Sequence, residues 1–223
     1  MIYTDTAGHY VASMSLQYDA KGRVVQMKID NPPNMDSLIH NYEYYASMVV
    51  EDIFYRDNTK YGRTIYDLDS DGRAISETDK GYSQNGDSSI AQTVTYKYEA
   101  GYMTEKKTCL FGDTAAWTRY TWQILNGNTI SMSLGLAIWG GAEVTETYTY
   151  YPGSVSTIGN ENAGKSFLGK SGTNLVKTSI TNNSTPSTGS YSYTYDAFNR
   201  VSVQMIRGNG LTSNSVNIAY TYY

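Results

Sequence analysis

The chain has 223 residues and a formal net charge of −4, and its 17 Lys and Arg residues are scattered along the sequence. Nucleic-acid-binding proteins concentrate positive charge on one face, so a nucleic-acid partner is not expected. No part of the sequence approaches the ~18 consecutive apolar residues of a transmembrane helix, so no membrane-spanning helix is expected either.

The 23 Tyr residues favour strands, as do Thr and Val, while the 20 Gly residues favour turns, as do Asn and Asp. Alternating patterns separated by turn signals predict strands at residues 10–18, 23–30, 37–45, 47–56, 61–68, 73–79, 91–99, 102–111, 116–125, 129–139, 143–151, 174–181, 190–196, 200–207 and 214–222. Loops are expected at 31–34, 80–89 and 182–190. The longest irregular stretch runs from Pro152 to Thr173, and a connection of this length is often functional or carries a short helix. No linker divides the chain, so residues 1–223 are expected to form a single all-β domain.

A pattern of aromatic or apolar residues, an acid, a glycine and an arginine recurs along the chain and predicts hairpins. Its full copies are Leu16–Arg23, Tyr66–Arg73 and Tyr193–Arg200, and Tyr96–Gly101 is a shortened copy. The acid can accept a hydrogen bond from the amide two residues on, and the Gly three residues after the acid supplies the positive φ that such a turn needs. Asn199 replaces that Gly in the last copy and tolerates the same conformation. Asp19 is expected to pair with Arg23 across the hairpin, and Asp196 with Arg200.

The hydrophobic pattern also predicts the register of these hairpins. In the last copy, a three-residue loop pairs Tyr195 with Val201, Tyr193 with Val203 and Tyr191 with Met205. In the first copy, the same counting sets Val25, Met27 and Ile29 opposite Gln17, Ser15 and Ser13, so both faces of that hairpin are expected to meet apolar surface. A three-residue loop at Asn126–Asn128 sets Tyr120, Trp122 and Ile124 opposite Leu134, Met132 and Ile130, and is preferred to a two-residue turn for that reason.

Residues Gly159–Ser166 match the phosphate-binding loop pattern letter for letter. In that loop, backbone amides surround the phosphates, Lys neutralises them and Ser holds magnesium. The motif requires a buried strand before it and a helix after it. Here the preceding residues 154–158 make a poor buried strand, and Gly169 and Gly172 would break a helix. We therefore do not expect a nucleotide or any other cofactor.

Asp67, Asp69 and Asp71 resemble the first half of a calcium-binding loop. Such a loop needs a bidentate Glu at its twelfth position, which is occupied here by Thr78. The same residues align with the hairpin repeat without an insertion, so a turn is the preferred interpretation. Whether the three carboxylates bind a cation stays open, and no metal site is predicted.

No set of residues indicates catalysis. Cys109 is the single cysteine and lies in an apolar stretch, which favours a buried structural thiol over a nucleophile. The two histidines, His9 and His40, have no metal-ligand spacing. The acidic residues lie mostly in turns or beside Lys and Arg, so no glycosidase pair can be nominated. We predict no catalytic residues and no enzyme.

The aromatic residues permit one kind of binding site. Tyr side chains, together with Trp117, Trp122 and Trp139, can stack on the apolar faces of sugar rings. For any one Tyr, packing in the core of a twisted sheet is the more common role. A sheet with so many Tyr residues is nevertheless expected to expose some of them.

The repeat copies ending in Arg23 and Arg200 resemble the tyrosine-aspartate (YD/RHS-like) repeats of bacterial cell-surface and toxin-shell proteins. The chain also resembles a bacterial family of secreted proteins of unknown function with a porin-like fold, whose members carry a segment similar to Leu168–Val176. This resemblance implies export, and because Met1 runs directly into strand-like sequence, we expect an export signal to have preceded it. It implies no catalytic residues.

The expected fold is an all-β antiparallel meander of about 12–15 strands, curled into an open or nearly closed barrel, with a two-sheet sandwich as the alternative. The expected function is a non-catalytic, extracytoplasmic binding or structural module of a bacterial cell envelope, with a polysaccharide or another surface protein as partner. One alternative is an outer-membrane barrel, favoured by the aromatic end 219–223 but opposed by Lys28, Glu105 and Lys106-Lys107 within strands. A glycan-active enzyme is the other alternative.

Overall fold

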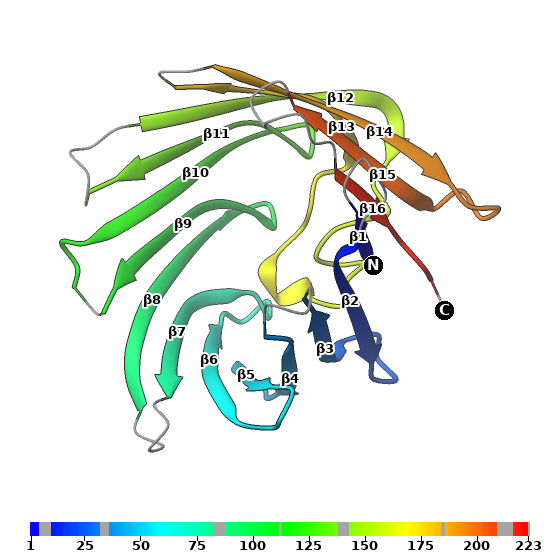
Figure 1. Ribbon diagram of the computed structural model, residues 1–223. Helices are drawn as coiled ribbons and strands as arrows, with labels where there is room; N and C mark the ends of the chain where they lie inside the picture. The colour runs from blue at the N-terminus through cyan, green and yellow to red at the C-terminus, as the bar shows by residue number, and fades with distance from the viewer. Residues whose placement is uncertain are drawn as a thin grey trace.

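The computed structural model describes residues 1–4, 10–31, 36–82, 88–111, 113–137, 143–183, 186–208 and 216–222. In these ranges an antiparallel meander of sixteen strands closes into a barrel, because β1 pairs with both β2 and β16 (Figure 1). The strands are β1 Ile2–Thr4, β2 Tyr10–Tyr18, β3 Val24–Asp30, β4 Leu38–Tyr44, β5 Met48–Tyr55, β6 Lys60–Leu68, β7 Ala74–Tyr82, β8 Ser88–Glu99, β9 Tyr102–Leu110, β10 Trp117–Leu125, β11 Asn128–Leu136, β12 Glu143–Val155, β13 Asn174–Asn182, β14 Ser187–Tyr195, β15 Val201–Gly208 and β16 Val216–Ala219. A 3₁₀ turn, η1, spans Ser166–Leu168.

The predicted all-β meander is confirmed, and its barrel is closed rather than open. Each of the predicted strands is present, with ends shifted by a few residues. The prediction missed β1, which has only three residues and no alternating pattern of its own, yet supplies the pairing to β16 that closes the sheet. Among the described residues there is no helix long and apolar enough to cross a membrane.

The repeat copies fold into the predicted turns. The residue three after the acid has positive φ in each full copy, at 74° for Gly22, 77° for Gly72 and 59° for Asn199. The Asp19 carboxylate accepts hydrogen bonds from the amides of Lys21 and Arg23 and from the Arg23 guanidinium. The Asp196 carboxylate does the same with Phe198 and Arg200, so both predicted cross-strand pairs are confirmed.

The predicted register is correct at the turn and wrong beyond it. Tyr195 pairs with Val201 as predicted, but a β-bulge follows, and Tyr193 and Tyr191 then pair with Gln204 and Ile206. A bulge adds one residue to one strand and reverses the faces of the residues that follow it.

A β-bulge at the equivalent place in the first copy, between Gln17 and Tyr18, changes which residues of that hairpin share a face. Leu16 pairs with Met27, and Met14 with Ile29, so apolar residues of both strands share one face. The expectation of apolar contacts on both faces of this hairpin is therefore wrong.

The turn between β10 and β11 also differs from the prediction. Leu125 pairs with Asn128 across a two-residue turn, in which Asn126 and Gly127 have φ of 51° and 77°. A bulge after this turn changes the phase of the ladder. Tyr120 and Trp122 consequently pair with Leu134 and Met132 as predicted, while Ile124 pairs with Thr129 rather than Ile130.

The buried core fills only part of the barrel interior, which we call the lumen. Its main cluster consists of Val24, Met27, Tyr42, Val49, Ala74, Val94 and Tyr96 from β3 to β8, packed around Phe167 of the β12–β13 connection, while Val50, Leu175 and Val201 are buried outside this cluster. In Figure 1 this connection, drawn in yellow, lies within the ring of strands. Because successive side chains of a strand alternate faces, the residues that share a face with this cluster line the lumen, and their neighbours face outward.

Candidate functional site

Residues 156–173, which connect β12 to β13, close one end of the lumen, and we call this segment the plug. Its backbone is hydrogen-bonded to several hairpin turns of the barrel: Gly164 O accepts from Val24 N at 3.1 Å, Lys170 N donates to Gly101 O at 2.8 Å, and Thr173 N donates to Gly127 O at 2.8 Å. The Thr157 hydroxyl accepts from Val201 N at 3.0 Å. The plug therefore joins turns that are far apart in sequence and covers the end of the barrel at which they lie.

Two glycines allow the plug to approach these turns closely. Both have positive φ, 72° at Gly164 and 83° at Gly169. A Cβ at Gly164 would lie 2.6 Å from Val24 N, and one at Gly169 would lie 2.9 Å from Gly101 O. Any larger residue would clash with backbone at both positions, so the plug requires glycine there.

Phe167, in η1, anchors the plug inside the barrel. Its side chain is 4% exposed and lies in edge or tilted contact with two tyrosines, with ring centroids 6.2 Å from Tyr44 and 5.0 Å from Tyr66. Such aromatic contacts add to the free energy gained by burying the ring. Phe167 thus fills the part of the lumen lined by β4 to β6.

A buried carboxylate, Glu51 on β5, is the centre of a polar network beside the plug. It is 5% exposed and accepts three hydrogen bonds: from Tyr42 Oη at 2.5 Å, from Tyr66 Oη at 2.9 Å and from His40 Nδ1 at 2.7 Å. With Nδ1 engaged, Nε2 of the buried His40 ring has no hydrogen-bond partner within the described part of the chain. Three donors directed at one carboxyl group favour its ionised form.

Lys165 of the plug supplies the nearby positive charge. Its Nζ lies 4.9 Å from the centroid of the Tyr42 ring, a cation–π distance. Burial lowers the pKa of Lys165, although the charge of Glu51 opposes this shift. Burial alone would raise the pKa of Glu51, but the hydrogen bonds from His40 and Tyr42 and the charge of Lys165 outweigh it and hold that pKa below its ordinary value. The network therefore holds an anionic Glu51 close to a plug cation.

A second carboxyl group, Glu77 on β7, lies one strand beyond Tyr66, with which it pairs. It is 7% exposed and accepts a hydrogen bond from Tyr96 Oη. Burial raises the pKa of Glu77 to about 7, opposed by the Tyr96 hydrogen bond. Lys106, whose Nζ lies 5.8 Å from the Tyr96 ring centroid, faces the lumen from β9. The lumen wall thus places an ionised carboxyl group on β5 and a readily protonated one on β7, with Tyr66 of β6 between them.

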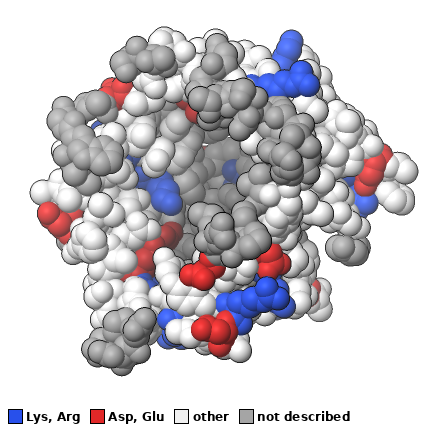
Figure 2. Space-filling view, in the orientation of Figure 1, with Lys and Arg blue, Asp and Glu red and all other residues white. Residues whose placement is uncertain are grey.

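The rest of the lumen is less filled. Lumen-facing residues of β9 to β12 are only half-buried, in contrast to those of β5 and β8 around Phe167. Figure 2, in the orientation of Figure 1, shows a hollow at the centre of the barrel with basic side-chain atoms inside it. The hollow is therefore a candidate ligand cavity, closed at one end by the plug.

An aromatic pair lines this half of the lumen. Tyr120 and Trp122 of β10 are stacked, with ring centroids 5.9 Å apart and planes 15° from parallel. Their lumen-facing neighbours carry polar groups: Lys106 pairs with Tyr120, and Glu146 pairs with Met132 on the adjacent strands and accepts from Tyr148 Oη at 2.8 Å. An aromatic surface beside a few polar groups can bind a ligand that has apolar faces and polar edges.

The outward face of the wall carries ion pairs between its strands, beside exposed apolar side chains such as Ile90 and Ile180. Asp52 pairs with Arg63 at 2.7 Å and with Lys60 at 2.6 Å, and Lys97 pairs with Glu105 at 2.7 Å. Lys28 and Lys107 also face outward, since their strand neighbours Met27 and Lys106 face the lumen. A lipid-facing barrel instead presents a continuous apolar band.

The structure explains the phosphate-loop match without a nucleotide. Lys165, the motif lysine, has its Nζ beside the Tyr42 ring and 3.8 Å from the Met27 sulfur. The motif is followed by the single 3₁₀ turn η1 instead of an α-helix. Its last glycine, Gly164, serves close packing against the β2–β3 turn.

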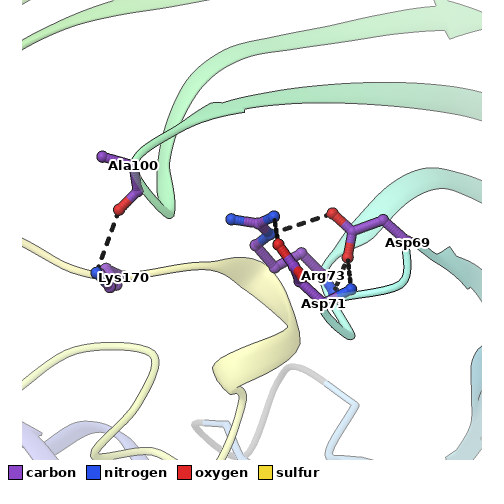
Figure 3. Close-up of polar contacts among 5 residues, drawn as sticks. All are labelled: Asp69, Asp71, Arg73, Ala100 and Lys170. Atoms are coloured by element: carbon purple, nitrogen blue, oxygen red, sulfur yellow. Dashed lines mark hydrogen bonds and ion pairs between the residues drawn. The ribbon is translucent and has the colours of Figure 1, made fainter.

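The three aspartates that resemble a calcium-binding loop have hydrogen-bond partners within the protein. Asp69 accepts from the amides of Asp71 and Arg73 and from the Arg73 guanidinium, which also bonds Asp71 (Figure 3). Asp67 faces outward and accepts from the Ser76 hydroxyl at 2.6 Å. Figure 3 also shows Lys170 of the plug donating to Ala100 O, at 3.2 Å. Within the described ranges, no group of three or more His, Cys, Asp or Glu residues is placed to hold a metal ion.

The remaining sequence candidates lie apart from one another. Cys109 is only half-buried and faces outward on β9, so the prediction of a buried thiol is wrong. Trp117 also faces outward, with the cationic groups of Lys107 and Arg119 5.5 and 5.2 Å from its ring centroid. His9 and Trp139 lie outside the described residues.

Two solved structures of bacterial proteins are similar to this fold. One, titled a porin-like protein from Bacteroides uniformis ATCC 8492, matches with a TM-score of 0.69 and 18% identity over 94% of this chain and 90% of that chain. The other, titled a porin-like protein from Bacteroides vulgatus ATCC 8482, matches with a TM-score of 0.61 and 11% identity over 100% and 98%. The fold is porin-like. No protein-family model and no curated protein matches the sequence.

Sequence reasoning did not nominate Glu51, Tyr42 or Lys165 as parts of one site. One signal was present: Glu51 stands between Val49 and Ile53 on one face of a strand, where a charge needs a buried partner. Its partner Lys165 lies more than 100 residues away in an irregular segment, so no local pattern joins the two.

Proposed function

We propose that this protein is a non-catalytic binding protein of a bacterial cell envelope that takes a glycan into the lumen of its barrel. The observation that carries the proposal is the stacked, half-buried pair Tyr120 and Trp122 on the wall of the central hollow. Aromatic rings pack against the apolar C–H faces of pyranose rings, while nearby polar side chains bond the hydroxyl edges. Lys106 and Glu146 face the same hollow and supply such groups.

The plug supports a binding cup rather than a passage. It is hydrogen-bonded to several turns at one end of the barrel and fills the neighbouring lumen with Phe167. A solute that enters the hollow would therefore meet a closed end. The similarity to porin-like proteins of Bacteroides supports an extracytoplasmic location.

Two of the lumen acids have limited access to a substrate, which argues against a glycosidase pair formed by Glu51 and Glu77. Glu51 and Glu77 are 5% and 7% exposed, and tyrosine hydroxyls occupy oxygens of both carboxyl groups. A glycosidase acid must instead reach the oxygen of the scissile bond.

The porin-like fold favours one second candidate, an outer-membrane barrel. Against it stand the outward ion pairs of Asp52 with Arg63 and of Lys97 with Glu105, which would lie in lipid. Purification without detergent distinguishes the binding protein from the outer-membrane barrel. A monodisperse protein in plain buffer supports the binding protein, while a strict requirement for detergent micelles supports the membrane barrel.

A glycan array combined with a reducing-sugar release assay tests the proposed function. We expect binding without hydrolysis, and a loss of binding in Trp122→Ala of about tenfold, since stacking of this kind is worth up to about 1.5 kcal/mol. Trp117→Ala, on the outward face, is the matched control and should bind as the wild type does. Absence of any glycan bound, or equal losses in the two variants, would contradict the proposal.

A further inference from the structure

A second hollow, of about 600 Å³, lies in the wall made by β5 to β8. It is lined on the lumen side by Ile53, Gly62, Thr64, Asp79, Gly81 and Gln92. Ile53, Gly62 and Gly81 are further from the plug than Glu51 and Glu77, because the plug contacts the opposite ends of these strands. This volume lies within the range of pockets that bind small molecules.

Paired glycines create the hollow. Gly62 and Gly81 are direct cross-strand partners, so two neighbouring lumen-facing positions carry no side chain. Neither residue has the positive φ that would require glycine for backbone reasons. Glycine inside a strand weakens it and often marks a place where a ligand approaches the backbone.

The floor of the hollow is a cross-strand row of polar side chains. Asp79 pairs with Thr64 on one side and Gln92 on the other. The Asp79 carboxylate accepts from the Thr64 hydroxyl at 2.6 Å and from the Gln92 amide nitrogen. Glu77, on the same face of β7, supplies a third hydrogen-bond partner, so at least one of the roughly four acceptor sites of the carboxylate stays free, and Gln92 keeps a carbonyl oxygen and a second N–H.

This donor and acceptor pattern suits a polyol better than a cation. A carboxylate beside an amide can accept from one hydroxyl and donate to its neighbour, as the two adjacent hydroxyls of a sugar require. Arg63 and Lys80 stand between these lumen-facing positions, so their side chains face outward, and the hollow holds the single carboxylate of Asp79 beside neutral Thr64 and Gln92, which is too few charged oxygen ligands for a cation site. Tyr61 also belongs to the lining.

We propose that this hollow is a subsite for one neutral pyranose ring, whose two adjacent hydroxyls bond Asp79 and Gln92 while the ring occupies the space left by Gly62 and Gly81. The subsite rests on the proposed glycan-binding function and gives it a location distinct from the Tyr120–Trp122 pair.

Two variants probe the subsite. Gly81→Val fills the hollow, and because a Cβ at Gly81 meets no atom within 4 Å, the fold has room for it. Asp79→Asn keeps the shape and removes the charged acceptor. Thr78→Val, the adjacent position on the outward face of β7, is the control. Thermal unfolding of each variant establishes that it is folded before binding is compared.

The probes are the methyl glycosides of glucose, galactose and mannose at millimolar concentration, observed by saturation-transfer difference NMR. The wild type and Thr78→Val should show transfer to the ring protons of at least one glycoside. Gly81→Val should abolish that transfer. Asp79→Asn should raise the dissociation constant about tenfold or more, as expected for the loss of a hydrogen bond to a charged group.

The possible results distinguish a failure of the proposed subsite from a failure of the proposed glycan-binding function. Glycan binding that is lost in Trp122→Ala but unchanged in Gly81→Val and Asp79→Asn overturns the subsite and leaves the proposed function intact. Transfer to spermidine instead of any glycoside overturns the choice of a neutral sugar. If no glycoside or array glycan binds the wild type, both proposals fail.

Discussion

Lys165 of the plug stands over the ring of Tyr42, its Nζ 4.9 Å from the ring centroid, while the hydroxyl of that ring donates to Glu51. One tyrosine thus contacts the plug cation through its face and the buried carboxylate through its edge. The stability of the barrel and the seating of the plug are coupled through this contact.

Glu51→Gln is expected to destabilise the fold by about 2–4 kcal/mol. The neutral amide is a weaker acceptor for Tyr42, Tyr66 and His40, and it leaves Lys165 without a compensating charge. Urea unfolding measures the change. Glu105→Gln, whose partner Lys97 is exposed, is the control and should cost at most about 1 kcal/mol; equal effects would contradict a special role for Glu51.

Phe167→Ala should destabilise the protein by about 3–5 kcal/mol, because it removes a ring that is 4% exposed and leaves a cavity against Tyr44 and Tyr66. Phe198→Ala is the matched control, since Phe198 is 79% exposed at a turn and should change stability little. Thermal denaturation compares the two. A loss of stability below about 1 kcal/mol in Phe167→Ala would mean that Phe167 does not anchor the plug.

Gly72→Ala should destabilise the β6–β7 turn by about 1 kcal/mol. A Cβ there meets no atom within 4 Å, so the cost arises from the φ of 77° alone. Asn199→Gly, at the equivalent turn position with φ of 59°, should be neutral or slightly stabilising. In urea unfolding, Gly72→Ala should lose stability while Asn199→Gly does not, and a loss of stability in both variants would contradict the shared role of these positions.

Glu77 should make stability fall as pH rises from about 4.5 to 7. Its pKa is raised to about 7 in the folded protein from an ordinary value of 4.5, so between these values the folded state binds more protons than the unfolded state. The shift corresponds to at most about 3 kcal/mol. Glu77→Gln, which keeps an acceptor for Tyr96, should lack this fall. The measurement is the difference in unfolding free energy between the two proteins across that pH range, and a difference independent of pH would refute the raised pKa.

The strands and turns follow largely from local chemistry. Alternation of side chains defines the strands, and Asp, Gly and Asn at set positions define turns such as Asp19–Arg23, because φ and nearby hydrogen bonds depend only on adjacent residues. The bulges were not predictable in this way. The pairing of Leu16 with Met27 requires a bulge, and its benefit comes from the shared lumen that both side chains enter.

The candidate site was accessible from sequence only in part. Trp122 and Pro152–Thr173 were identified from the sequence as places of interest. The sequence did not show that the Trp122 ring faces a hollow, or that Pro152–Thr173 closes one end of the barrel. Asp79 and Gly81 carried no signal by themselves, since a hollow exists only where strands set their lumen-facing residues side by side.

The sequence by itself determined an all-β meander of hairpins and the conformation of its repeated turns, since both arise from contacts between residues close in the chain. Only the tertiary structure decided that the meander closes through β1 and β16, that Phe167 and Lys165 enter the lumen, and that the ion pairs of the wall face outward. The closure and the contacts of the plug depend on packing between residues more than a hundred positions apart, and the choice of outward face follows from that closure, so no local pattern encodes these features.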